Sequence, residues 1–314
     1  VLAAEDGRAM GACVRIPLIC VVAMMALAAL ESPSAMLCAM RPRSSRPIRR
    51  LGLCGHQRHG GARGASSPCG ARASGGGKGK RDMVKLDGAS KLALHLYDHC
   101  PYCTRVELVL GWRHLPYDRV VYGYADVEGP TALTGKKVLP VFEWTDSSGQ
   151  QRRMGESVDI IRAVDGMDGP EGRIVSPKSS RKDLNAWQRR LRQVMHRLTR
   201  PRLIRMPIAD FATPADVRYQ MDKYTERGFD YEAALASTEE LLPRVERLLS
   251  EFDELMQGDE SISGKGWSWD DLYTLPSLRI LTCVAGLRWP AKTLRYVQEA
   301  HARAGVALYS EHAC

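Results

Sequence analysis

The sequence predicts an α/β domain over residues 90–168 and an all-helical domain over residues 178–314, both preceded by a long leader. Three observations predict this arrangement. Short apolar runs of strand character alternate with helix-like patterns after residue 90. Strand-like alternation does not recur beyond the Gly- and Pro-rich stretch 166–176, which we interpret as a linker. A chain of 314 residues is also long enough to form two hydrophobic cores.

Residues 1–80 are predicted to be a targeting presequence followed by a disordered linker. Residues 16–30 form an apolar run of signal-peptide length, short of the roughly 20 residues that span a bilayer. The tract that follows, residues 41–80, is rich in Arg and Ser and has no acidic residue, as transit peptides do. A signal followed by a transit tract predicts a plastid location reached through the secretory route. The alternatives are a mitochondrial location, or a membrane anchor in the secretory system.

The formal charge of +9 belongs to the leader and not to the predicted domains. Residues 1–80 hold 12 Lys and Arg against 3 Asp and Glu, whereas the remaining residues hold 33 of each kind. An electrically balanced body argues against a nucleic-acid partner. The cysteines are too few and too clustered for a secreted disulfide scaffold, so a catalytic pair is favoured.

The function is predicted to centre on Cys100 and Cys103, in a Cys-Pro-Tyr-Cys motif. An alternating apolar run over 91–97 predicts a strand before the motif, and 104–112 predicts a helix after it. Free N–H groups and the helix dipole favour a thiolate at this position. Cys100 is therefore the predicted nucleophile and Cys103 the thiol that resolves its mixed disulfide, forming a redox-active disulfide. The preceding His99 is predicted either to tune the thiol or to be merely solvated.

A zinc site and an inert buried pair are the alternative interpretations of these cysteines. No second C-x-x-C or H-x-x-x-H pair follows, so no metal site is predicted.

The rest of the α/β domain is predicted from short patterns that alternate between strand and helix. The expected strands are 117–122, 138–144 and 150–154, and the expected helices are 128–133 and 155–164. Pro140 inside a strand would remove a ladder hydrogen bond unless the strand lies at a sheet edge or the peptide bond before the proline is cis. We favour the cis bond, because a thioredoxin-like arrangement of the strands would place this proline against the Cys-Pro-Tyr-Cys motif. Glu156 and Ser157, at the start of the last helix, are suited to capping it.

Five helices are predicted in the second domain from capping residues and apolar periodicity. A helix over 182–198 is expected to stop before Pro201, and Thr213-Pro214 opens the next one. The others are a long helix over 232–256, kinked at Pro243, a largely apolar one opened by Ser268 and ended at Gly286, and one over 291–302. Cys283, within the apolar helix, is predicted to be a core residue.

Several motifs, in order along the chain, resemble the glutaredoxin 2 family. They are Tyr-Asp-His-Cys-Pro-Tyr-Cys at 97–103, Val-Leu-Pro at 138–140, Met-Gly-Glu-Ser-Val-Asp-Ile-Ile at 154–161, and further matches at 200–202, 211–215 and 278–290. The resemblance covers about residues 91–310. It implies a thioredoxin-like α/β domain followed by an all-α glutathione-transferase-like domain.

This resemblance implies a glutathione-dependent thiol–disulfide oxidoreductase that reduces disulfides and glutathione mixed disulfides through Cys100 and Cys103. Glutathione would be the cosubstrate, with no metal and no bound nucleotide, and the partners would be disulfide-containing or glutathionylated proteins. The protein is expected to be a monomer without a stable membrane span in its mature form. The implied glutathione-binding residues are Pro101, Tyr102, Leu139, Pro140, Glu156 and Ser157.

Other interpretations of these residues and of the chain stay open. Tyr102 is otherwise a packing residue, and Glu156 and Ser157 are otherwise an ordinary helix cap. The alternative functions are a glutathione transferase and a membrane-associated interaction protein of the transferase fold.

Overall fold

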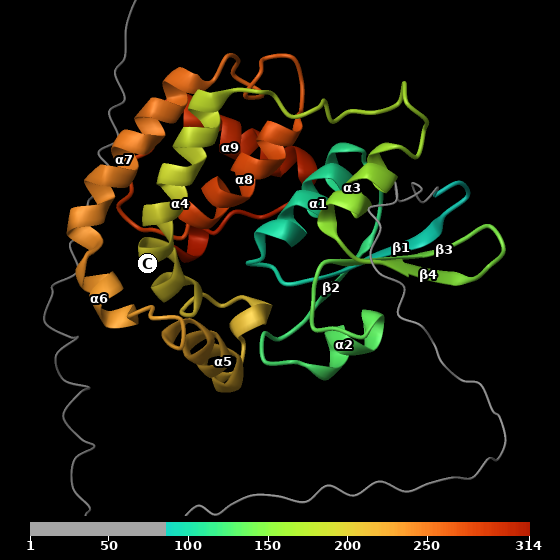
Figure 1. Cartoon of the computed structure of the whole chain (residues 1–314), viewed down its shortest axis with the longest axis horizontal. Helices are drawn as coiled ribbons and strands as arrows, with labels where there is room; N and C mark the ends of the chain where they lie inside the picture. Colours follow the sequence, from blue (N-terminus) through green and yellow to red (C-terminus); the bar gives the residue numbers. More distant parts are fainter. Residues whose placement is uncertain (1–85) are drawn as a thin grey trace, which may run out of the picture. The chain divides into compact units, whose positions relative to one another are not determined.

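A computed structural model of the chain describes residues 86–314, which belong to one compact unit (Figure 1). The predicted presequence of residues 1–80 lies outside the described residues, so the signal, the transit tract and the plastid location stay predictions. Among the helices of residues 86–314, none is long and apolar enough to cross a membrane.

The first half of this unit is built on a four-stranded mixed sheet with strand order β2-β1-β3-β4. Its strands are β1 (Ser90–Leu96), β2 (Asp118–Val121), β3 (Val141–Thr145) and β4 (Gln151–Met154). β1 pairs in parallel with β2 and antiparallel with β3, which pairs antiparallel with β4. β1 thus lies inside the sheet, and its last three residues are all buried, as expected for a strand covered on both faces.

Three helices cover this sheet. α1 (Pro101–Trp112) and α3 (Ser157–Asp165) pack together on one side, and α2 (Glu128–Thr134) lies on the other (Figure 1). The predicted strands and helices of this half are confirmed, with shifts of a few residues at their ends. The largest shift concerns the third strand, which begins at Val141 and not at Val138. Pro140 therefore lies just before β3, and its peptide bond with Leu139 is cis, as predicted.

The second half is helical, as predicted, apart from an isolated bridge between Ser176 and Ser268. α4 and α7 run side by side, and α8 contacts α1, α4 and α9 (Figure 1). Capping boxes open α5 at Thr213 and α8 at Ser268, and both confirm the expected N-caps. The elements are α4 (Lys182–Leu203), η1 (Ala209–Phe211), α5 (Pro214–Thr225), α6 (Tyr231–Ala236), α7 (Thr238–Leu255), α8 (Trp269–Leu281), α9 (Ala291–Ala304) and η2 (Ser310–His312).

Two of the predicted helix boundaries were wrong around prolines. α4 does not stop before Pro201 but continues to Leu203 with the proline inside it. Near a helix end a proline removes one hydrogen bond, and here the Arg202 side chain donates an additional one to the carbonyl of Leu198 (2.7 Å). The predicted helix over 232–256 is divided into α6 and α7 at Ser237, and Pro243 lies within α7.

Hydroxyl side chains explain where these helices end. Ser237 Oγ donates to the carbonyl of Ala233 (2.6 Å), and Thr238 Oγ1 donates to that of Leu235 (2.7 Å). Such bonds compete with the helical ladder. Thr282 Oγ1 likewise donates to the carbonyl of Arg279 (2.7 Å), and α8 ends at Leu281, earlier than the predicted Gly286.

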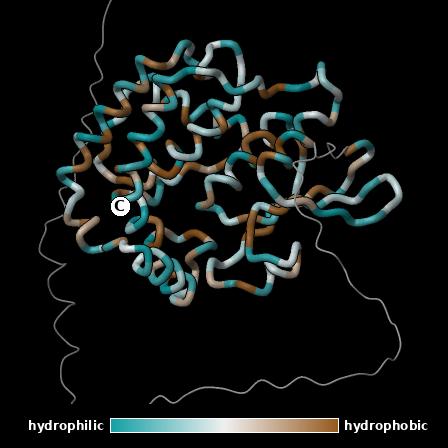
Figure 2. The backbone as a smooth tube through the Cα atoms, in the orientation of Figure 1, coloured by the Kyte–Doolittle hydropathy of each residue, from teal (hydrophilic) through white to brown (hydrophobic). Residues whose placement is uncertain are grey.

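The two halves share one hydrophobic core through α1, which packs on α3, α8 and α9. Figure 2 shows hydrophobic residues gathered where the sheet and α1 meet. Trp112 donates its indole N–H to the carbonyl of Ala300 (2.9 Å) and stacks on Trp267 at 4.0 Å between ring centroids. At Gly111 a side chain has no room, since an added Cβ would lie 2.1 Å from the carbonyl oxygen of Ala304 in α9. Cys283 is fully buried in this core, as predicted.

Candidate active site

The two cysteines of the Cys-Pro-Tyr-Cys motif lie where β1 leads into α1. Cys100 is the N-cap of α1 with an extended backbone, and Pro101 is the first helical residue. Proline suits this position because its missing N–H has no partner there in any case. Cys103 is fully buried in the first turn, whereas Cys100 is partly exposed, and both are free thiols. The predicted placement of the pair at a helix N-terminus is confirmed.

The environment shifts the pKa values of the two thiols in opposite directions. A hydrogen bond from the Cys103 thiol, the charge of His99 and the backbone N–H groups of Cys103 and Tyr102 outweigh burial and lower the pKa of Cys100 to about 7. Burial, followed by the hydrogen bond to Cys100, raises the pKa of Cys103 well above its ordinary value. Cys100 is therefore the thiol that ionises first, and Cys103 stays protonated at neutral pH.

His99 is held by a buried carboxylate that the sequence did not predict. Asp210, in η1, accepts hydrogen bonds from His99 Nδ1 (2.5 Å) and from the backbone N–H groups of His99 (2.7 Å) and Asp98 (2.9 Å). The His99 ring also packs against Tyr124 and Phe211, each at 4.9 Å between centroids. The interpretation of His99 as a solvated side chain is therefore wrong, and the interpretation as a group that tunes Cys100 is favoured.

A second buried network holds Asp98, two residues before the nucleophile. Arg279 of α8, only 1% exposed, donates to the Asp98 carbonyl (2.6 Å) and contacts both carboxylate oxygens (3.2 Å each). The Tyr309 hydroxyl donates to the same carboxylate (2.9 Å). Although burial opposes it, the Arg279 charge together with these hydrogen bonds lowers the pKa of Asp98. The helical half thus fixes the backbone that presents the motif.

Cys100 opens into a cleft of about 560 Å³ between the N-terminus of α1, the loop before β3 and helices α4, α5 and α8. Among the described residues, 86–314, no carboxylate lines this cleft. Its cationic side chains are Arg105, Lys137, Arg192, Arg200 and Lys223. The cleft is therefore suited to a negatively charged ligand that reaches the thiol.

Three of the six implied glutathione-binding residues line this cleft, and the other three lie outside its lining. Pro101, Tyr102 and Leu139 line it together with Cys100, and Pro140 is buried directly behind Leu139. The Tyr102 ring is 54% exposed, so it is a cleft wall and not a core packing residue.

Glu156 and Ser157, at the N-terminus of α3, are not among the residues that line the cleft. Glu156 is exposed, has φ 64°, and makes no side-chain capping bond, so its predicted capping role is wrong. Residues that cap a helix through their side chain typically have β-region backbone, which Glu156 lacks, and this explains the missing bond. Ser157 is buried in the first turn of α3.

A metal site is not evident in the described part of the chain. Within residues 86–314 no group of three His, Cys, Asp or Glu side chains is placed to hold a metal ion.

Two family models match the chain. The model of the glutaredoxin 2 C-terminal domain matches residues 183–313, and that of the glutathione S-transferase N-terminal domain matches residues 94–171.

Known proteins and solved structures extend this similarity to nearly the whole described unit. Glutaredoxin 2 of Escherichia coli K12 is 32% identical over 205 residues, covering 65% of this chain and 92% of the relative. The crystal structure of Salmonella typhimurium glutaredoxin 2 in complex with glutathione matches with a TM-score of 0.66 and 27% identity, covering 72% of this chain and all of that one. The glutathione transferase GSTFuA3 of Phanerochaete chrysosporium matches in fold alone, with a TM-score of 0.52 and 14% identity over 68% of this chain and 98% of that one.

The fold and the cysteine motif define the class of this protein. A thioredoxin-like α/β half with a Cys-x-x-C at its first helix, joined to an all-helical half, is a glutathione-transferase-like fold with a redox motif. Within that class, the chain belongs to the glutaredoxin 2 family.

Proposed function

We propose that the protein is a glutathione-dependent thiol–disulfide oxidoreductase that uses Cys100 as nucleophile and Cys103 as resolving thiol. The observation that supports it most directly is the division of the two thiols, with the pKa of Cys100 lowered to about 7 and that of Cys103 raised. The thiolate lies in a cleft without carboxylates, and glutathione has net negative charge. The Salmonella relative was solved with glutathione bound.

The reaction on a glutathionylated protein needs only Cys100. Its thiolate attacks the glutathione sulfur of the mixed disulfide, a new bond to Cys100 forms, and the protein leaves as a thiolate that takes up a proton. A second glutathione thiolate then attacks the glutathione sulfur bound to Cys100. Oxidised glutathione leaves, and the Cys100 thiolate is restored.

Reduction of a disulfide within a protein uses both cysteines. Cys100 forms a mixed disulfide with one substrate sulfur, and Cys103, once deprotonated, attacks the Cys100 sulfur and releases the substrate as a dithiol. Two molecules of glutathione then reduce the Cys100–Cys103 disulfide. Cys103 lies one helical turn away and is buried, so it reacts only with the Cys100 sulfur of the mixed disulfide.

We assign the glutathione-binding roles as part of this proposal. Tyr102 would lie beside the cysteine of the tripeptide, and the backbone of Leu139 before cis-Pro140 would hydrogen-bond to it. Glu156 and Ser157 would receive its γ-glutamyl end, which requires the ligand to extend from the thiol toward the N-terminus of α3.

The test is a glutathione-coupled reductase assay with two single variants. Cys100→Ser is expected to abolish activity on every substrate. Cys103→Ser is expected to keep much of its activity on glutathionylated substrates and to lose more on disulfides within proteins. If Cys103→Ser were equally inactive on both, glutathione would not resolve the intermediate, and the glutathione-binding roles would lose their support.

Glutathione transfer to electrophiles is the second candidate function, because the transferase N-terminal domain model matches residues 94–171. Two results together would favour transferase activity. Cys103→Ser would conjugate glutathione to an aryl halide at the wild-type rate, and the wild type would not reduce disulfides.

A further inference from the structure

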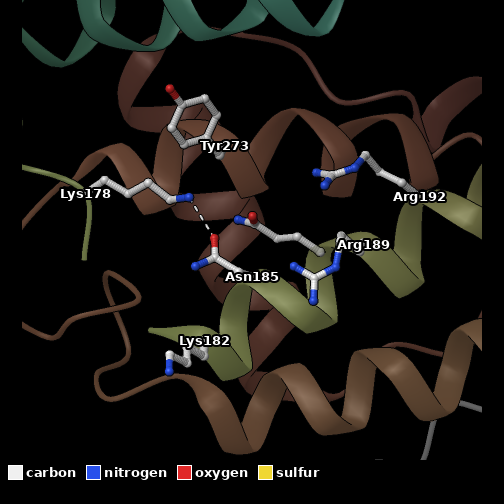
Figure 3. Close-up of a pocket in the computed structure, with 7 residues that line it drawn as sticks. Lys178, Lys182, Asn185, Arg189, Arg192 and Tyr273 are labelled. Carbon is white, nitrogen blue, oxygen red and sulfur yellow. Dashed lines mark hydrogen bonds between the residues drawn. The ribbon is translucent and has the colours of Figure 1, made fainter. Parts of the chain in front are cut away.

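A second hollow adjoins the thiol cleft and has no place in the proposed reaction. It measures about 640 Å³ and is lined by Lys178, Lys182, Asn185, Gln188, Arg189, Arg192 and Tyr273. Figure 3 shows these side chains coming from the start of α4, from α8 and from the segment before α4, with Lys178 directed at Asn185. Two of the residues, Arg192 and Tyr273, also line the thiol cleft, so the two hollows adjoin. We call the second hollow the α4 groove.

Within the part of the chain that the structure describes, the lining of the α4 groove has four cationic side chains and no carboxylate. A neighbouring cation of the same helix, Arg190, pairs with Glu251. Within residues 86–314, Lys182, Arg189 and Arg192 have no carboxylate partner, and all three are exposed. Because the sequence beyond residue 80 is balanced in charge, this concentration of positive charge is local.

Alternating rings and cations connect the groove to the redox motif. The guanidinium of Arg105 lies 5.0 Å from the centroid of Tyr102 and 4.6 Å from that of Tyr273. The ammonium of Lys178 lies 5.4 Å from the Tyr273 ring. Aromatic and basic surface thus continues from the residue beside Cys100 into the α4 groove. A ligand that presents its sulfur to Cys100 can extend along this surface.

We infer that the α4 groove binds an acidic polypeptide segment next to the disulfide or glutathionylated cysteine of a protein substrate. This inference rests on the proposed function. Lys182 to Arg192 spans ten residues of α4, or about 15 Å at the helical rise of about 1.5 Å per residue. An extended peptide covers that length with about five residues. The occupant is therefore a short stretch rich in Asp and Glu, close in sequence to the reacting cysteine.

A peptide fits better than a nucleic acid because the groove adjoins the thiol. A ligand that occupies both hollows places one of its groups at the Cys100 thiol, and a disulfide of a polypeptide can react there, whereas a nucleic acid carries no such group. Exposed charge pairs contribute about twofold each in binding, so three or four pairs together predict a preference of roughly tenfold for an acidic peptide. The preference is expected to fall as salt rises, since these charges are screened over about 10 Å at 0.1 M ionic strength.

The test compares two glutathionylated peptides in the full-length protein, one with four Glu residues beside the cysteine and one with Gln in their place. The groove variant is Lys182→Gln/Arg189→Gln, which leaves the lining of the thiol cleft intact. The matched control is Arg190→Gln/Arg288→Gln, with the same change of charge at paired cations outside the groove. We expect the wild type and the control to prefer the Glu peptide about tenfold in kcat/KM, mainly through KM, and the groove variant, which keeps Lys178 and Arg192, to prefer it only about two- to threefold.

Two further measurements separate this inference from the proposed function. Reduction of a small glutathione mixed disulfide reports the redox chemistry alone, and the groove variant is expected to match the wild type there. Binding of a fluorescent Glu peptide with Ser in place of Cys reports the groove alone.

The inference would be overturned if the groove variant and the control lost equal amounts of the preference for the Glu peptide over the Gln peptide. It would also be overturned if the wild type showed no such preference. Tighter binding of a single-stranded oligonucleotide than of the peptide would overturn it as well. Absence of small-substrate activity in the wild type, with the groove-dependent peptide binding intact, would overturn the proposed function instead.

Discussion

The hydrogen bond from Cys103 to Cys100 leads to a quantitative prediction about the reactivity of the nucleophile. Replacing Cys103 by alanine removes the largest cause of the lowered Cys100 pKa, whereas serine keeps a hydroxyl donor at the same place. We expect the pKa of Cys100 to rise from about 7 toward the 9.0 of a free thiol in Cys103→Ala, and to stay near 7 in Cys103→Ser. The His99 charge and two backbone N–H groups remain, so the full rise is an upper limit.

Two opposing effects decide the rate of attack on a disulfide. At pH 7 the thiolate fraction falls from about one half to about 1% for the full rise, a roughly 50-fold loss. A thiolate of higher pKa is intrinsically more nucleophilic, by about 6- to 10-fold over two pKa units. At pH 7 the fall in thiolate fraction is larger than the gain in nucleophilicity. Cys103→Ala is therefore expected to react up to about 5- to 8-fold more slowly than Cys103→Ser. Near pH 10 both variants are ionised, and the order reverses.

The assay follows release of the chromophore from a dipyridyl disulfide as a function of pH. Cys100→Ser supplies the reaction of all other thiols, including the exposed Cys314, for subtraction. The expected result is a pair of curves that cross between pH 7 and pH 10. Superimposable curves for the alanine and serine variants would refute the assignment of the Cys103 thiol as the donor that lowers the Cys100 pKa.

The remaining predictions concern the packing of the two halves. Arg279→Met removes the buried guanidinium and leaves Arg119 (2.7 Å) as the remaining cation of Asp98, so the free energy of unfolding in urea is expected to fall by about 3 kcal/mol, the low end for a broken buried pair; a loss below about 1 kcal/mol would contradict the reasoning. In the same assay Gly111→Ala is expected to lower the free energy of unfolding by about 1–3 kcal/mol, because its Cβ would meet the backbone of α9. Gly155→Ala serves as the control, because the space around Gly155 is open. A fragment of residues 81–175 is expected to be poorly soluble and to lack a cooperative urea transition, because α1 would lose its contacts with α8 and α9; a stable folded monomer would argue against the shared core.

Features determined by neighbours in the sequence could be predicted, and those that depend on distant partners could not. The capping boxes at Thr213 and Ser268 involve residues three positions apart, so their patterns are visible in the sequence. Pro201 misled the prediction because proline near the last turn of a helix removes little, and a side-chain donor from Arg202 was not foreseeable.

The same distinction holds at the active site. The cysteine pair and its helix N-terminus follow from a strand, a motif and a helix in direct succession. Asp210 lies 112 residues from Asp98, and Arg279 lies 181 residues from it. Nothing in either local sequence shows that a buried carboxylate and a buried guanidinium meet the motif. A weak signal for Asp210 was its position directly before the motif at 211–215, which was part of the family resemblance.

The anchoring of Asp98 by α8 has a thermodynamic consequence for the redox couple. Arg279 and Tyr309 hydrogen-bond to the carbonyl and the carboxylate of Asp98. A shift of the motif backbone on disulfide formation would therefore be transmitted to the helical half. By linkage, any difference in interface strength between the dithiol and disulfide forms appears equally as a displacement of the midpoint potential, about 30 mV for every 1.4 kcal/mol. The packing of the helical half thus contributes to the midpoint potential of the proposed cysteine couple. A ligand that stabilises this packing in one redox form would make the protein a stronger or a weaker reductant without contacting either sulfur.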